Sequence, residues 1–176
     1  MGAMSGKFFL TGLPGSGKST VFLRCVEGLR GLGFTVGGIA TPEIRSRGRR
    51  IGFNVLDLAT GRRGLLAGVT VASDYQVGRY GVDLQGFEAV ALPALKFAEE
   101  SCDVVGIDEI GRMEFFSETF RRRVDELVDG PKPLIAVLHR NYVGAFKGKG
   151  ETYVVSPENR EGLSRMVVSG IREYLG

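Results

Sequence analysis

The chain of 176 residues is 43% hydrophobic and 24% charged, which is ordinary for one globular domain and argues against a disordered or fibrous protein. The formal net charge of +3 suits a polyanionic ligand but is too small to indicate nucleic-acid binding, which the composition neither implies nor excludes. We find no apolar run long enough to span a bilayer and no signal-peptide pattern, so we expect no membrane association and a cytoplasmic location.

The two cysteines, Cys25 and Cys102, lie far apart in the sequence, so we expect buried thiols rather than a disulfide or a metal cluster. We find no internal repeat, low-complexity tract or domain boundary, which predicts one domain over residues 1–176. Met1 to Met4 are expected to include a remnant of cloning. The oligomeric state stays open, with a monomer favoured.

A phosphate-loop motif follows the first apolar stretch. It fits the pattern of a glycine, four free residues and Gly-Lys-Ser/Thr, and it consists of Gly12, Leu13, Pro14, Gly15, Ser16, Gly17, Lys18, Ser19 and Thr20. Its glycines let successive backbone N–H groups turn inward around a β-phosphate. Lys18 would place its charge between the β- and γ-phosphates, Ser19 would join the shell of a Mg²⁺ cofactor, and Thr20 would reach the α-phosphate.

The segments on either side of the loop have the order that the motif requires. Phe8-Phe9-Leu10 predicts a short strand before it. After it, Phe22, Val26 and Leu29 predict a helix face, with Leu23 and Leu32 alongside.

The next segments predict strands and an insertion. Residues 35–40 have little side-chain bulk and predict a second strand, and residues 41–50 predict a polar, arginine-rich loop. Residues 51–58 and 65–72 predict two strands joined by a turn at Thr60-Gly61-Arg62, which would form an inserted antiparallel hairpin. Residues 77–84 predict a loop or a short strand.

The middle of the chain leads to two adjacent acids. A helical apolar stripe follows, with Pro93 starting or kinking the helix; it consists of Phe87, Val90, Ala91, Leu95 and Ala98. Residues 104–107 then predict a buried parallel strand that ends at Asp108 and Glu109.

These two acids lie where a phosphate-loop enzyme needs a carboxylate. We assign Asp108 to the magnesium shell. Glu109 points to the other side of the strand and is expected to orient the water that attacks the γ-phosphate, which favours hydrolysis. Glu114, farther along, fits equally a supporting acid and a charge at a helix start.

The remaining sequence predicts two helices and two strands. Residues 134–138 and 153–155 predict strands, separated by a basic, mobile loop over residues 146–150. One helix would bury Phe120, Val124, Leu127 and Val128 and expose Arg121, Arg122 and Arg123 to solvent. The last helix would begin at Ser156-Pro157-Glu158, with Ser156 as its cap, and would bury Leu163, Met166, Val167, Gly170, Ile171 and Tyr174.

Several polar side chains are less specific candidates. Arg79, Arg112 and Lys147 could each stabilise transition-state charge, although each fits a surface cation better. His139 ends a strand and could face the nucleotide, although a satisfied strand-end group fits a lone histidine better.

The alternation of strands and helices predicts an α/β fold of the P-loop NTPase kind, with a mostly parallel sheet and helices on both faces. Ligands of such folds lie at the carboxyl ends of the strands.

The motifs together resemble the THEP1 nucleoside-triphosphatase family over nearly the whole chain. They are the phosphate loop, Arg50-Ile51-Gly52-Phe53 with Thr60-Gly61, Val77-Gly78-Arg79-Tyr80 with Val82-Asp83-Leu84, Ile107-Asp108-Glu109-Ile110-Gly111 with Met113-Glu114, and Glu158-Asn159-Arg160. One departure from the family pattern is Arg112, where relatives often have proline or lysine. It leaves the acidic pair unchanged but bears on the geometry of the loop that follows.

The resemblance implies slow, Mg²⁺-dependent release of the terminal phosphate from ATP, GTP and other nucleoside triphosphates, without strong base preference. It implies that residues 12–20 bind phosphates and that Asp108 and Glu109 form the metal and water-orienting pair, with Gly111 beside them. Asn159 and Arg160 would lie near the base, or would be exposed residues of a first helical turn.

Two other functions compete with hydrolysis. A nucleotide or polynucleotide kinase would use the basic segment from Lys147 to Lys149 as a lid. A nucleotide-gated RNA-binding module would use the arginines of residues 45–50 and 121–123.

Overall fold

The computed structural model describes residues 5–176, so the expected cloning remnant at residues 1–4 lies outside the described part of the chain. Five strands form its parallel half, namely β1 (Lys7–Thr11), β2 (Val36–Ala40), β8 (Val104–Ile110), β9 (Leu134–Leu138) and β10 (Glu151–Val154). The mostly apolar, buried residues of β1, β2, β8 and β9 are what a sheet covered on both faces requires, whereas the edge strand β10 is mostly exposed.

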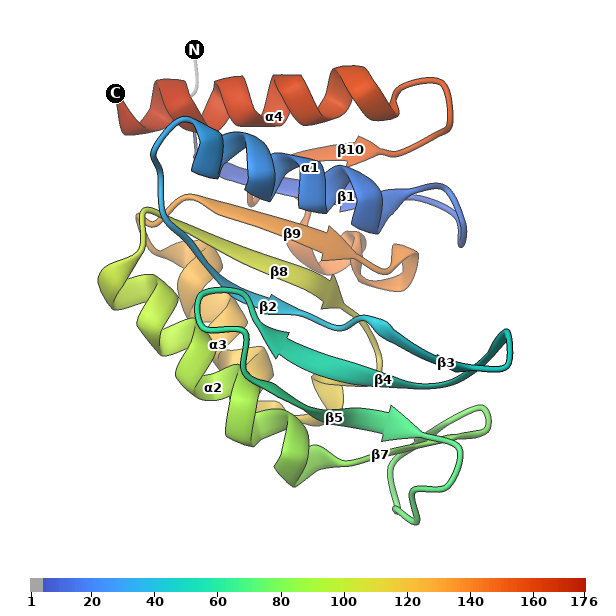
Figure 1. Cartoon of the computed structure of the whole chain (residues 1–176). Coiled ribbons are helices and arrows are strands. Elements are labelled where there is room, and N and C mark those ends of the chain that lie inside the picture. Colours follow the sequence, from blue (N-terminus) through green and yellow to red (C-terminus); the bar gives the residue numbers. More distant parts are fainter. Residues whose placement is uncertain (1–4) are drawn as a thin grey trace.

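The antiparallel half comes from one continuous segment between β2 and the second helix. It contains β3 (Glu43–Ser46), β4 (Arg49–Asp57), β5 (Arg63–Gly68), β6 (Gln76–Val77) and β7 (Tyr80–Val82). The whole sheet has the order β10-β1-β9-β8-β2-β4-β5-β7-β6, with β3 paired to β4 beside this path (Figure 1). The inserted antiparallel hairpin is therefore confirmed, and further strands extend it.

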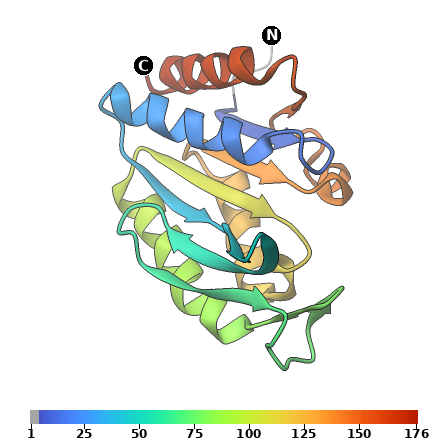
Figure 2. The same ribbon diagram turned by 45° about the vertical axis from the view of Figure 1, so that its right-hand side comes forward.

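Four helices cover the two faces of the sheet, namely α1 (Lys18–Gly31), α2 (Leu84–Ser101), α3 (Glu118–Asp129) and α4 (Arg160–Leu175). α1 and α4 pack together on one face, and α2 and α3 cover the other (Figures 1 and 2). Short 3₁₀ helices connect the rest, namely η1 (Glu114–Phe116), η2 (Arg140–Tyr142) and η3 (Gly144–Phe146). No helix within residues 5–176 combines the length and apolar character needed to cross a membrane.

Alternation along the strands divides the core into two layers. Phe8 and Leu10 of β1 point into the layer under α1 and α4, whereas Phe9 points into the layer under α2 and α3. Cys25 and Cys102 are buried free thiols, one in each layer, as predicted. Because the layers share one sheet, the phosphate loop after β1 has a rigid support on both sides.

Several predicted boundaries were wrong. Residues 41–50 contain β3 and the start of β4 rather than only a loop. The prediction failed because β3 lies outside the main path of the sheet and its mostly polar, mostly exposed residues show no alternation with apolar ones. β5 ends at Gly68, short of the predicted Ala72, and β10 spans residues 151–154 rather than 153–155. α2 begins at Leu84, where Asp83 caps it, and Pro93 lies inside the helix.

The predictions of where α4 begins and which residues of α1 and α4 are buried were also partly wrong. α4 begins at Arg160, not at Ser156, because the side chain of Asn159 bonds the backbone of Ser156 and holds that segment in a turn. Met166 is 47% exposed, and so are Leu23 and Leu32, since each lies at the edge of its helix's apolar stripe. The predicted stripe of α3 is confirmed.

Candidate active site

Glycines form the tight turn between β1 and α1. Gly15 and Gly17 have φ values of +77° and +100°, in the left-handed region that favours glycine. A Cβ at Gly12 would lie 2.7 Å from Oγ of Ser16 and 2.8 Å from the carbonyl oxygen of Val155. The loop therefore has no room for side chains at its closest points, as a cradle of backbone amides requires.

Lys18 and Ser16 lie close to Gly12 in this turn. Nζ of Lys18 donates to the carbonyl oxygen of Gly12 at 3.0 Å, so the lysine folds back over the loop that precedes it. The hydroxyl oxygens of Thr11 and Ser16 are buried and have no hydrogen-bond partner among residues 5–176. Buried polar atoms normally have partners, so these hydroxyls suit a site completed by a ligand.

Asp108 joins the phosphate loop from β8, two strands away from β1 in the sheet. The hydroxyl of Ser19 lies beside its carboxylate and stabilises its ionised form. Burial raises the pKa of Asp108 to about 7, against the opposing effects of the Ser19 hydroxyl and the nearby charge of Lys18. The structure thus brings together three predicted site residues from two segments.

Glu109 lies in a β-bulge. Asp108 pairs with Val137 and Ile110 pairs with Leu138, so Glu109 is an extra residue without a partner on β9. A bulge re-aims the side chain that it contains and interrupts strict alternation. β8 therefore continues through the two acids rather than ending before them, and Glu109 is partly exposed beside the buried Asp108.

Glu114 completes a group of three acids. It is the first residue of η1 and is only 3% exposed. A Cβ at Gly111 would lie 3.0 Å from Oε1 of Glu109 and 3.0 Å from Oε1 of Glu114, so both carboxyl groups lie beside Gly111. Burial, with the charge of Glu109, raises the pKa of Glu114 well above its usual range.

The start of α4 also reaches the phosphate loop. A Cβ at Gly17 would overlap Cδ of Arg160, so the arginine packs across this glycine. Asn159 instead shapes the preceding turn: Oδ1 accepts from the backbone N–H of Ser156 at 2.8 Å, and Nδ2 donates to the carbonyl oxygen of Val154 at 2.9 Å.

Of the three candidate cations, Arg79 lies far from this location. Nη2 of Arg79 donates to the carbonyl oxygen of Arg50 at 2.6 Å and to the hydroxyl of Tyr80 at 3.2 Å. β7, which follows it, lies six strand positions from β1, on the order of 29 Å at about 4.8 Å per strand. Arg112 lies over the ring of Phe116 at 6.0 Å, and Lys147 is exposed.

His139 caps η2. Its Nδ1 accepts a hydrogen bond from the backbone N–H of Asn141 at 3.1 Å, and its ring lies edge-on to that of Tyr142. The interpretation as a satisfied strand-end group is confirmed.

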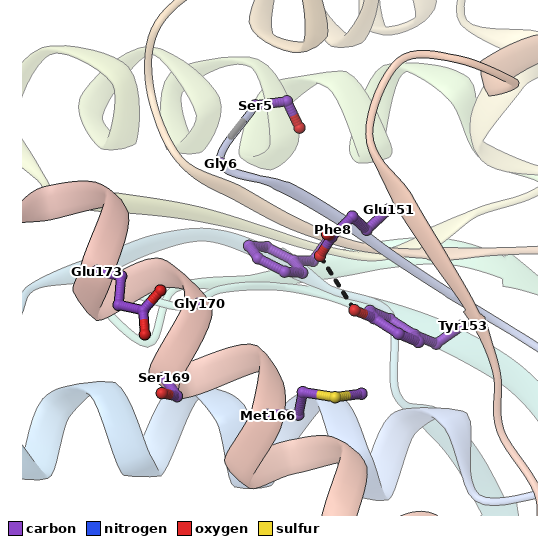
Figure 3. Close-up of a pocket in the computed structure, with 9 residues that line it drawn as sticks. All are labelled: Ser5, Gly6, Phe8, Glu151, Tyr153, Met166, Ser169, Gly170 and Glu173. Atoms are coloured by element: carbon purple, nitrogen blue, oxygen red, sulfur yellow. Dashed lines mark hydrogen bonds between the residues drawn. The ribbon is translucent and has the colours of Figure 1, made fainter. Parts of the chain in front are cut away.

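Two pockets lie away from the phosphate loop. One of about 340 Å³ lies between α4 and the strands β1 and β10, where Phe8 and Tyr153 meet Met166 and Glu173 of the helix (Figure 3). It reaches Ser5 and Gly6, before β1, whereas the phosphate loop follows that strand. The other, of about 250 Å³, lies between α1 and α4 and contains Arg24, Arg165 and Arg172. Neither contains a predicted site residue.

Sequence reasoning missed two features. It left the role of Glu114 open, although an acid between Met113 and two phenylalanines is a signal for an unusual, buried carboxyl group. It gave no indication that Arg160 contacts Gly17, because the two residues are distant in the chain.

Comparisons with known proteins identify relatives of the whole chain. A family model described as NTPase matches residues 7–168. The nucleoside-triphosphatase THEP1 of Methanocaldococcus jannaschii is 43% identical over 165 residues, which cover 94% of this chain and 96% of that protein. The THEP1 of Methanothermobacter thermautotrophicus is 44% identical over 172 residues, covering 97% and 98%.

Two solved structures are similar over nearly their whole length. The crystal structure of THEP1 from Aquifex aeolicus has a TM-score of 0.82 at 31% identity, covering 93% of this chain and 97% of that one. The solution structure of a human cancer-related nucleoside triphosphatase has a TM-score of 0.81 at 34% identity, covering 97% and 98%.

Proposed function

Because the chain belongs to the THEP1 nucleoside-triphosphatase family, we propose that it hydrolyses nucleoside triphosphates with Mg²⁺ and with little preference for the base. The products are the nucleoside diphosphate and inorganic phosphate. The observation that carries the proposal is the convergence of Lys18, Ser19 and Asp108, with Glu109 directly beside them.

The donor set suits magnesium. Mg²⁺ prefers oxygen ligands and commonly takes one or two carboxylates together with phosphates and water, and the hydroxyl of Ser19 already meets the carboxylate of Asp108. These two residues would hold the ion. When bound, Mg²⁺ would neutralise charge on the phosphate oxygens.

The chain's own groups have separate roles in binding and hydrolysis. Backbone amides of residues 12–17 and the hydroxyl of Thr20 bind the phosphates, and Lys18 stabilises the charge that grows on the γ-phosphoryl group. Glu109 orients a water for attack on the γ-phosphorus and accepts its proton as the bond to the bridging oxygen breaks. Gly111 keeps space beside that carboxylate.

The base contributes little in this proposal. The residues named above all address phosphates, which every nucleoside triphosphate shares. Arg160, which packs on Gly17, and Asn159 would border the nucleoside without reading its edge. This explains why several triphosphates would be substrates.

The test separates binding from chemistry. Lys18→Ala should weaken ATP and GTP binding in calorimetry by about 100-fold, while Lys96→Ala, at an exposed position of α2, should not.

Glu109→Gln should keep the affinity and lower phosphate release by about 10²- to 10⁴-fold, with the exposed Glu100→Gln as control. Unchanged affinity in Lys18→Ala, or transfer of the γ-phosphate to an added acceptor faster than to water, would contradict the proposal.

A further inference from the structure

Glu114 has an unusual position for an acid. It is 3% exposed and lies on η1. If Gly111 had a Cβ, that atom would lie 3.0 Å from Oε1 of Glu114 and 3.0 Å from Oε1 of Glu109. The two oxygens are therefore within twice 3.0 Å of each other. Such a spacing allows either a direct hydrogen bond or one bridged by a single water.

The surroundings of Glu114 favour the protonated form of its carboxyl group, which can donate a hydrogen bond. Burial raises its pKa well above the usual range, and the negative charges of Glu109 and Asp108 act in the same direction. A protonated carboxyl group has one O–H to donate, and a carboxylate oxygen can only accept.

The support of η1 keeps this group in place. The backbone N–H of Phe115 donates to the carbonyl oxygen of Gly111 at 3.0 Å, and the ring of Phe115 packs edge-on to Phe120 and Tyr142. Glu114 is thus anchored by a buried aromatic cluster rather than by a free loop.

We propose that Glu114 is a positioning residue for Glu109: its protonated carboxyl group donates a hydrogen bond, directly or through one water, to one oxygen of Glu109. The other oxygen of Glu109 then faces the attacking water. Glu114 itself touches neither the substrate nor the metal. This inference rests on the proposed role of Glu109 in hydrolysis.

Two substitutions of similar size test the donor. Glu114→Gln keeps an N–H donor, so kcat should stay within about 3-fold of the original, whereas Glu114→Met fills the space without a donor and should lower kcat by about 10- to 100-fold. KM should change little in either variant because the phosphate-binding groups are untouched. Thermal melts verify that both variants fold, which separates the effect from a purely structural one.

A double variant tests whether Glu114 acts through Glu109. In the Glu109→Gln protein, adding Glu114→Met should lower the residual rate by less than about 2-fold, because the group that it positions is already gone. The inference is overturned if Glu114→Gln and Glu114→Met both match the original kcat, or if both are equally slow. It is also overturned if adding Glu114→Met to the Glu109→Gln protein lowers kcat by as large a factor as it does in the original protein. A fully active Glu109→Gln protein would instead overturn the proposed function itself.

Discussion

Gly17 links the backbone geometry of the site to its side chains. Its φ of +100° requires the left-handed region, and Arg160 occupies the space where a Cβ would lie. A side chain there would strain the backbone and also displace the arginine.

We predict that Gly17→Ala weakens nucleoside-triphosphate binding by at least about 10-fold, a loss of about 1.4 kcal/mol, measured by calorimetry. Gly31→Ala is the matched control, because Gly31 lies at the end of α1 with open space around it. That control should bind as the original does. Equal affinity in the two variants would show that the turn tolerates a side chain.

Glu114 also makes stability depend on pH. Burial raises its pKa in the folded chain above the usual 4.5, so over the range between these two values the folded state holds a proton that the unfolded chain has lost. The contribution of Glu114 to stability is therefore complete below about pH 4.5 and declines as the pH rises toward the folded pKa.

Glu114→Gln cannot ionise, so we predict that its unfolding free energy falls less steeply between pH 5 and pH 8 than that of the original chain. Urea titrations at several pH values measure this slope. The exposed Glu100→Gln should leave the slope unchanged. A slope in Glu114→Gln as steep as the original would mean that Glu114 does not retain its proton.

At the scale of elements, the bulge in β8 is the feature that the proposed mechanism depends on. Parallel strands normally send successive side chains to opposite faces, yet the proposed mechanism needs Asp108 and Glu109 to serve one reaction. The extra residue changes the direction of Glu109 while Ile110 returns to pairing with β9.

Ser117 connects α3 to α2 close to this site. It is fully buried, its Oγ accepts from the backbone N–H of Phe120 at 3.1 Å, and it donates to Oε1 of Glu88 at 2.6 Å. It therefore caps α3 and also satisfies an acid of α2.

We predict that Ser117→Ala lowers the unfolding free energy by about 1–3 kcal/mol, because it removes the cap and leaves Glu88 without its donor. Phosphate release per folded molecule should stay near the original, because within residues 5–176 the Ser117 side chain hydrogen-bonds only with Glu88 and Phe120. Its backbone N–H, which donates to the carbonyl oxygen of Glu114 at 3.2 Å, is kept in the variant. Chemical denaturation measures the loss, and the exposed Ser101→Ala provides the comparison. If Ser117→Ala lowered the unfolding free energy no more than Ser101→Ala does, the stabilising role of the Ser117 contacts with α2 and α3 would be contradicted.

At the scale of the whole molecule, one sheet connects both core layers and both halves of the site. We therefore propose that residues 1–176 form a single domain. The phosphate loop, Asp108 and the start of α4 lie at the carboxyl ends of the parallel strands, so local unfolding of either layer would disturb the site.

This arrangement predicts one cooperative unfolding transition, with coincident curves from circular dichroism and tyrosine fluorescence. Mg²⁺ and a non-hydrolysable triphosphate at about 100 times Kd should raise the unfolding free energy by about 2.7 kcal/mol. Lys18→Ala should unfold in the same single transition but show little ligand shift. Two separate transitions would indicate layers that fold independently.

The chain's local patterns were sufficient for the phosphate loop, the parallel strands, the buried stripe of α3 and the pair Asp108-Glu109. Each of these depends on residues within one turn or strand, where glycine spacing or apolar periodicity limits the conformation. The same patterns were insufficient for β3, whose mostly polar residues do not alternate with apolar ones, and for the exposure of Met166.

Only the tertiary structure decided which distant residues meet. Ser19 lies beside Asp108, Arg160 covers Gly17, and the carboxyl groups of Glu114 and Glu109 both lie beside Gly111. Sheet order, a one-residue bulge and the packing of η1 bring these residues together. Local sequence fixes the chemistry that a segment offers. The proximity of two segments depends instead on the burial of every apolar face at once, a property of the whole chain.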